Sequence, residues 1–370
     1  MIVEKKRFSA ESFHFEEADT AIPVSIGYET YGALSESRDN AVLVCHYFTG
    51  TGHAAGRYSP EDPAPGWWNS LIGPGKPLDT ERFFVICSDT PANINFHNPK
   101  VITTGPATVN PLTGKEYGLL FPIFTLKDVV RLQKLLLESL GIPRLRLVTG
   151  PSMGGLQAFM WARHFPAEVE QVIAVCATPE IGPYGIMVPN QLGIDAIMLD
   201  PNFRNGDYYG KEPPYDGLLL AFKNLLMATR TEGWAERSFG RAHADSEYRE
   251  YEDPRRSLKG KFLVEKEVEA MVKSRMQFFD PNSYLYIAKA NTLFDLREGG
   301  ESYEKALGHI EARTLMVIDK SDSMFTPAQA EKARRHIRDC RCAYYDSGNG
   351  HLSCIFEQGY LERYFREFLG

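Results

Sequence analysis

The residues best suited to chemistry form a glycine-rich turn around Ser152. Residues 150–154 read Gly-Pro-Ser-Met-Gly, an apolar run with strand character precedes them, and a helical pattern follows. A serine on such a sharp strand-to-helix turn is raised above the sheet, and side chains larger than glycine would collide at the flanking positions. The pattern predicts that Ser152 is a nucleophile and that the backbone amide of Met153 points at a developing oxyanion. An ordinary glycine-rich turn is the alternative.

A serine nucleophile needs a general base, and the base needs an orienting carboxylate. Two later loops can supply them. The apolar run at residues 315–318 leads into a loop that carries Asp319 and Asp322, and the run at 342–345 leads through a glycine-rich turn to His351. We predict His351 as the base and Asp322 as its partner. Asp319 is the competing candidate because it lies nearer the strand end.

A second oxyanion donor is expected in the loop after the early apolar run at residues 41–47. Small residues surround Phe48 there, so its backbone N–H could approach a substrate. We therefore assign Phe48 to the oxyanion hole. His46, in the same run, is interpreted as a structural hydrogen-bonding residue.

These residues require a framework of buried parallel strands. Continuous apolar runs of this kind belong to parallel sheets that helices cover on both faces. The runs are residues 41–47, 83–87, 145–149, 172–177 and 315–318. Helical patterns fall at residues 126–140, 155–165 and 358–369. The alternation of strand and helix predicts an α/β, doubly wound, mostly parallel sheet.

The alternation stops in the middle of the chain. Residues 181–300 are rich in helical patterns and in proline and glycine, without a convincing buried strand. We predict a core of residues 1–180 and 301–370 and a helical lid insertion at 181–300. Such an insertion could close over the strand ends, where open α/β folds bind ligands.

Composition excludes several other classes of protein. The 370 residues include 41 Lys and Arg against 48 Asp and Glu, a net charge of −7, so neither nucleic acid nor an anionic membrane is an expected partner. The start of the sequence lacks the pattern of a secretory signal, and no apolar run is long enough to cross a membrane. The six cysteines form no zinc-ligand pattern, and we expect no metal, reduced thiols and a cytoplasmic location.

Over nearly its whole length, the chain resembles the homoserine O-acetyltransferase family of α/β-hydrolase-fold enzymes. The resemblance lies in residues 28–32, 44–50, 66–76, 79–87, 104–106, 121–122, 152–155 and 280–285. The run Gly-Trp-Trp-Asn-Ser-Leu-Ile-Gly-Pro-Gly-Lys at 66–76 is the most specific of these. The resemblance implies an α/β-hydrolase fold and a triad of Ser152, Asp322 and His351. It also implies an acyl-serine intermediate, a helical lid, and often a dimer formed through that lid.

The chain departs from this family at three positions expected to hold homoserine. Leu352 follows the predicted base where members usually carry Asp for the substrate amine, and Phe222 replaces the Arg that clamps the carboxylate. Thr229 stands where a Tyr is expected. Lys223 or Arg230 could restore the carboxylate contact. The loop at residues 88–95 also differs from the family's usual glycine-rich segment.

These observations lead to an enzyme that transfers an acyl group through Ser152. Our main interpretation is a carboxylic-ester hydrolase or an O-acyltransferase for a less polar substrate than homoserine. The alternative is a homoserine O-acetyltransferase of methionine biosynthesis, and a minor one is a non-catalytic binding protein on the same fold. We expect no bound cofactor, although acyl-CoA could be the donor substrate, and the resemblance makes a homodimer the expected assembly.

Overall fold

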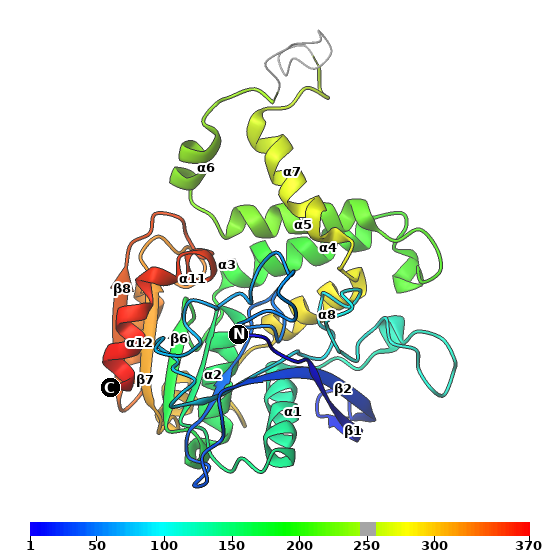
Figure 1. The fold of residues 1–370 in the computed structure, drawn as a ribbon. Helices are drawn as coiled ribbons and strands as arrows, with labels where there is room; N and C mark the ends of the chain where they lie inside the picture. The colour runs from blue at the N-terminus through cyan, green and yellow to red at the C-terminus, as the bar shows by residue number, and fades with distance from the viewer. Residues whose placement is uncertain (245–256) are drawn as a thin grey trace.

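The computed structural model describes residues 1–244 and 257–370 and is built around one eight-stranded sheet (Figure 1). The strand order is β1-β2-β4-β3-β5-β6-β7-β8. The strands are β1 (Lys6–Phe15), β2 (Thr20–Tyr31), β3 (Ala41–Val44), β4 (Phe84–Ser88), β5 (Leu147–Pro151), β6 (Gln171–Val175), β7 (Arg313–Asp319) and β8 (Cys340–Tyr345). Strands β3 to β8 run parallel, and the antiparallel β1–β2 pair extends the sheet beyond β4.

The central strands are buried on both faces because their side chains are apolar on both faces. Every residue of β3, β5 and β6 is buried. Each of the five apolar runs overlaps a strand, and the observed ends lie within three residues of the expected ones. The α/β class with a mostly parallel sheet, predicted from the sequence, is confirmed.

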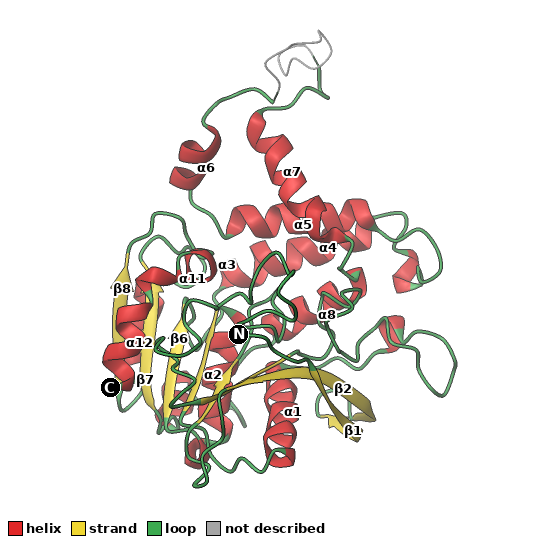
Figure 2. Ribbon diagram, in the orientation of Figure 1, coloured by secondary structure: helices red, strands yellow, loops and turns green. Residues whose placement is uncertain are grey.

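Helices cover both faces of this sheet (Figure 2). On one face, α1 (Leu126–Ser139), α2 (Met153–His164) and α10 (Pro327–Arg334) contribute to the larger apolar core. On the other face, α11 (Ser353–Phe356) and α12 (Glu362–Leu369) contribute to a second core. The expected helix at residues 358–369 is interrupted: a 3-10 turn, η5 (Gln358–Tyr360), precedes α12. There the side chain of Gln358 donates to the carbonyl of Trp67 at 2.6 Å.

Between β6 and β7, in the segment that we call the insertion, the helices and helical turns that the structure describes are joined by loops. Its elements are α3 (Pro183–Gly185), the π-helix η3 (Ile186–Gln191), α4 (Leu192–Leu199), η4 (Arg204–Gly206), α5 (Tyr215–Ala228), α6 (Glu232–Phe239), α7 (Leu263–Met276), α8 (Pro281–Thr292) and α9 (Tyr303–Gly308). Figure 1 shows α4 and α5 beyond the strand ends, with α6 and α7 extending away from the sheet. In the described ranges, no helix has the length and apolar character needed to cross a bilayer.

A short turn, η2 (Pro166–Glu168), follows α2, and the remaining helical turn, η1 (Gly118–Leu120), lies in the long connection between β4 and α1. It packs next to η4 of the insertion. Tyr286 of α8 fastens this connection, because its hydroxyl donates to the carbonyl of Phe121 at 2.6 Å. This hydrogen bond therefore joins the connection to α8.

Candidate active site

Ser152 sits in a strained turn between β5 and α2. Its backbone has φ 55° and ψ −124°, a conformation that L-residues rarely adopt and that marks functional positions. The Ser152 amide donates to the carbonyl of Val175 at 2.9 Å, which ties the turn to β6. A Cβ at Gly150 or Gly154 would lie 2.3 Å or 2.1 Å from the carbonyl oxygen of Cys45. The two glycines are therefore required by the close approach of the loop after β3.

His351 connects Ser152 to Asp322 through two short contacts. Its Nε2 lies 2.7 Å from Ser152 Oγ, and its Nδ1 lies 2.7 Å from Asp322 Oδ2. Because a carboxylate only accepts hydrogen bonds, Nδ1–H donates to Asp322 and Nε2 is left to accept the serine proton. All three side chains are buried, with 8%, 4% and 3% exposure for Ser152, His351 and Asp322. This arrangement can activate a serine for attack on a carbonyl carbon.

The structure distinguishes Asp322, the predicted partner of His351, from the competing candidate Asp319. The other oxygen of Asp322, Oδ1, accepts from the amides of Met324 at 2.7 Å and Phe325 at 3.1 Å, so the carboxylate is held in place. Asp319 instead ends β7 and accepts from the amide and hydroxyl of Ser321, at 2.8 Å and 2.7 Å. Asp319 therefore fastens the strand end to its own loop, and Asp322 faces the imidazole.

A cavity of about 280 Å³ opens onto Ser152 and His351. Its walls are mostly apolar and come from the loop after β3, the start of α2, the insertion, the loop after β7 and the segment from His351 through α11. The lining includes Phe48 and Met153, the two predicted oxyanion donors. Met153 is the first residue of α2, where backbone amides have no acceptor within the helix. A ligand carbonyl in this cavity could thus meet the serine hydroxyl and a helix N-terminus together.

Aromatic side chains form one wall of the cavity. The Phe48 ring packs edge-on against Tyr284 at 5.3 Å between centroids. Phe222 stacks on Phe279 at 4.5 Å and meets Tyr284 edge-on at 5.3 Å. The ring of Phe48 is thus anchored to α8, and the position of its backbone depends on the loop around it.

The side-chain amides of two buried asparagines hold that loop, residues 45–53, in place. Asn93 Nδ2 donates to the carbonyl of Gly50 at 3.1 Å, and Asn95 Nδ2 donates to the carbonyl of Thr49 at 3.1 Å. His46 Nδ1 donates to the carbonyl of Tyr47 at 2.7 Å, and its Nε2 lies 3.3 Å from Asn93 Nδ2. Burial lowers the pKa of His46, so it is neutral near pH 7 and acts as a hydrogen-bonding residue in this loop.

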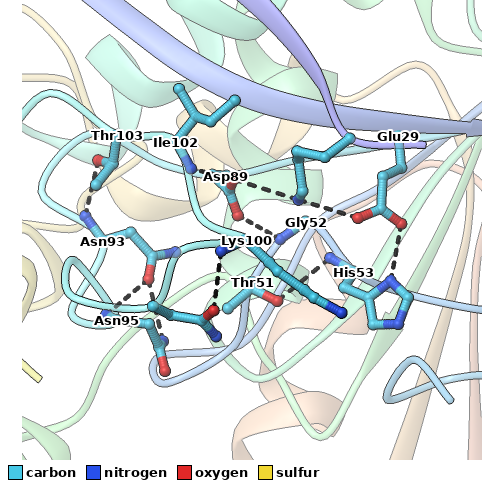
Figure 3. A network of polar contacts seen from close by, with 12 residues as sticks. Glu29, Thr51, Gly52, His53, Asp89, Asn93, Asn95, Lys100, Ile102 and Thr103 are labelled. Atoms are coloured by element: carbon cyan, nitrogen blue, oxygen red, sulfur yellow. Dashed lines mark hydrogen bonds and ion pairs between the residues drawn. The ribbon is translucent and has the colours of Figure 1, made fainter. Parts of the chain in front are cut away.

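A buried ionic network supports the far end of the same loop (Figure 3). The Gly52 amide donates to Asp89 Oδ1 at 2.6 Å, and Lys5 lies 3.4 Å from Asp89 and 3.0 Å from Glu29. His53 Nδ1 contacts Glu29 at 3.0 Å. Burial alone would raise the pKa of Glu29, but His53 and Lys5 outweigh that effect and lower it. These residues, which the sequence analysis did not single out, fix the loop that carries Phe48.

We expect Asn93→Ala to reduce kcat for p-nitrophenyl acetate by about 10- to 100-fold, because a loosened loop misplaces the Phe48 amide. Its KM and thermal midpoint should change less. Asn98→Ala is the matched control, since the side chain of Asn98 accepts only from the Lys100 amide at 3.0 Å outside this loop. Equal kcat losses in the two variants would contradict the positioning role of Asn93.

The four residues predicted to contact substrate, Leu352, Phe222, Thr229 and Arg230, all line the cavity. The hydroxyl of Thr229 is engaged with the carbonyls of Leu225 and Leu226, at 3.0 Å and 2.9 Å. Lys223, the other residue proposed to replace the carboxylate clamp, is not in the lining. The sequence analysis missed Arg275 of α7, which lines the cavity, since nothing near it in the chain relates it to Ser152.

Comparisons with known proteins agree with this geometry. The family model for the alpha/beta hydrolase fold matches residues 40–358. A homoserine O-acetyltransferase of Deferribacter desulfuricans is 42% identical over 363 residues, which is 97% of this chain and 93% of the relative. The crystal structure of homoserine O-acetyltransferase from Bacillus anthracis has a TM-score of 0.95 and 39% identity, covering 100% of this chain and 98% of that one.

An esterase is almost as similar in structure. Esterase E22 has a TM-score of 0.93 and 35% identity, covering 100% of each chain. The acyltransferase names of the curated relatives nevertheless favour the homoserine alternative over the less polar substrate that the sequence analysis placed first. They also confirm the prediction of an acyltransferase enzyme. The chain belongs to the homoserine O-acetyltransferase family of α/β-hydrolase-fold enzymes.

Proposed function

We propose that this enzyme transfers a short acyl group through an ester formed on Ser152. The observation that carries the proposal is the continuous chain of contacts from Asp322 through His351 to Ser152 at the floor of a cavity. His351 takes the serine proton as Oγ attacks the acyl carbonyl, and Asp322 stabilises the imidazolium. The same proton then goes to the leaving group, and the acyl-serine remains.

The amides of Phe48 and Met153 hold the oxyanion in each half of the reaction. In the second half, His351 removes a proton from the acceptor, the acceptor oxygen attacks the acyl-serine, and Ser152 recovers its proton. The buried position of the triad keeps these transfers in a site with little competing water. The identity of the acceptor then determines whether the enzyme is a transferase or a hydrolase.

Homoserine, with acetyl-CoA as the donor, is the acceptor that the relatives support. The similarity to homoserine O-acetyltransferases spans nearly the whole chain, at 42% identity for the relative from Deferribacter desulfuricans. The B. anthracis enzyme supports it with a TM-score of 0.95. Under this proposal the insertion supplies the acceptor pocket.

Hydrolysis of a less polar ester is the second candidate, and the composition of the cavity favours it. Leu352 and Phe222 line the cavity at two positions where polar homoserine contacts are expected, and none of the described lining residues is an aspartate or a glutamate. The ammonium group of homoserine would therefore meet no counter-charge, which costs binding energy. Similarity to esterase E22, at 35% identity, supports the same candidate.

One experiment separates the two candidates. The enzyme is given acetyl-CoA and, in parallel, p-nitrophenyl acetate, with and without L-homoserine, and the acetyl group is followed into acetate or O-acetylhomoserine. Transfer is expected to give O-acetylhomoserine at the expense of acetate, whereas hydrolysis gives acetate at a rate that homoserine does not change. Leu352→Asp restores a carboxylate next to His351 and should raise the homoserine share at least about tenfold if the missing counter-charge is the cause.

We also propose a homodimer formed through the insertion, in the cytoplasm. Exposed apolar side chains on α4 and α5 support the dimer: Leu199, Leu220 and Met198 are 83%, 57% and 52% exposed. Six free cysteines support a reducing compartment. Sedimentation equilibrium of the wild type and of Leu199→Glu tests the dimer, which the charged variant should weaken.

A further inference from the structure

Apart from His351, the charged side chains among the described residues of the cavity wall are two arginines, Arg230 and Arg275. Arg230 follows the end of α5, and Arg275 lies in the last turn of α7. Among the described residues that line the cavity there is no carboxylate to pair with either guanidinium. A mostly apolar cavity with unpaired positive charge is suited to a ligand with an apolar part and an anionic group.

Arg230 packs against aromatic rings, and no hydrogen bond of its side chain to another described residue is seen. Its guanidinium carbon lies 4.8 Å from the Trp234 ring centroid and 5.5 Å from that of Phe356, on the side of the cavity that carries the His351 loop. Its Nε atom is buried without a hydrogen-bond partner, and the side chain forms no ion pair in the described ranges. Burial lowers the pKa of Arg230, and this effect outweighs the nearby charge of Glu357, which acts in the opposite direction. A buried unpaired donor of this kind is stabilised when an anion binds.

Arg275 lies next to the loop that carries Phe48. Its Nη2 donates to the carbonyl of Thr49 at 3.3 Å, and its guanidinium carbon is 5.4 Å from the Phe279 ring centroid. The hydrogen bond fixes the side chain at the cavity wall, its acceptor is a neutral carbonyl, and Arg275 forms no ion pair with the described residues. The segment after α5 and helix α7 thus each place a guanidinium group at the cavity.

We propose that Arg230 and Arg275 form an anion subsite for a carboxylate or phosphate of the substrate, and that no counterpart subsite for an ammonium group exists in the described wall. This inference rests on the proposed acyl transfer and refines its substrate class: the substrate carries an anionic group, and the described wall disfavours the ammonium group of homoserine. The two sources of the anion are the carboxylate of a hydroxy-acid acceptor and the phosphates of an acyl-CoA donor. Guanidinium groups recognise both by charge-assisted hydrogen bonds.

Calorimetric titration of the wild type tests the carboxylate source without any catalysis. The probes share one carbon chain: 1,4-butanediol is neutral, 4-hydroxybutyrate is an anion, and L-homoserine is its zwitterionic amino derivative. We expect 4-hydroxybutyrate to bind at least about tenfold more tightly than 1,4-butanediol, and no less tightly than homoserine. For the phosphate source, the same titration compares the affinity for CoA with the affinity for pantetheine, which lacks the phosphates.

Arg230→Gln and Arg275→Gln should each remove most of the preference for whichever anion binds. Lys223→Gln is the matched control, because it removes a positive charge from α5 outside the cavity lining and should keep the preference. The anion subsite is wrong if 4-hydroxybutyrate binds no more tightly than 1,4-butanediol and CoA binds no more tightly than pantetheine. If homoserine binds tenfold more tightly than 4-hydroxybutyrate, the cavity does have a site for an ammonium group. Binding without turnover of p-nitrophenyl acetate would instead reject the proposed acyl transfer and leave the subsite intact.

Discussion

Ser152→Ala is expected to lower acyl transfer from p-nitrophenyl acetate by at least about 10⁴-fold, because it removes the only atom that can form the acyl-enzyme in this mechanism. The residual rate then comes from the cavity and the oxyanion amides alone. Rapid quenching followed by peptide mass spectrometry should find the acetyl group on the peptide that contains Ser152 in the wild type and on no peptide of the variant.

Ser323→Ala is the control for this prediction. Ser323 is an exposed serine next to Asp322, and its hydroxyl donates to the carbonyl of Ala228 at 3.3 Å rather than to the triad. Its variant should retain the acetylated peptide and the wild-type rate within about twofold. An acetyl group that persists in Ser152→Ala, or a loss of rate below tenfold, would show that another residue is the nucleophile.

Asp322→Asn is expected to reduce kcat by about 10³- to 10⁴-fold while the fold is kept. The amide is nearly the same size as the carboxylate, but its NH₂ group can donate to His351 Nδ1 and so favours the tautomer that carries the proton on Nε2. That tautomer cannot accept the proton of Ser152. Pre-steady-state acylation should be slowed by the same factor, and the circular dichroism spectrum should be unchanged.

Asp346→Asn provides the comparison, since Asp346 is an exposed carboxylate in the loop that leads to His351. We expect its kcat to stay within about twofold of the wild type. A loss in Asp322→Asn no larger than that in Asp346→Asn would remove Asp322 from the mechanism. Asp319 would then need testing, although its Oδ1 accepts from Ser321 and its Oδ2 accepts from the hydroxyl of Ser347.

The sequence predicted much of the framework because the relevant signals are local. Five apolar runs marked strands of the parallel sheet, and helical spacing marked α1 to within one residue. The errors occurred where tertiary contacts override local pattern. The helix expected at 358–369 is interrupted where Gln358 bonds to Trp67, a residue 291 positions away.

The candidate catalytic residues were also predictable, since each sits at a strand end with a distinctive local motif. The glycines around Ser152 report a steric requirement that is visible in the chain itself, and a glycine-rich turn precedes His351. The choice between Asp319 and Asp322 was less accessible. Three residues separate them, and only the packing of the loop after β7 decides which carboxylate meets the imidazole.

By itself, the sequence determined the class of fold, the glycine-flanked turn at Ser152 and the candidate residues Ser152, Asp322 and His351, because strand pattern and backbone strain are properties of neighbouring residues. Only the tertiary structure decided which side chains share the cavity. Arg230 follows α5 and Arg275 lies in α7, so they come from different parts of the insertion, and Asn93 supports a loop more than 40 residues before it through its contact with Gly50. These contacts join distant segments, and the physical reason is that charge balance and buried hydrogen bonding are satisfied in space rather than along the chain.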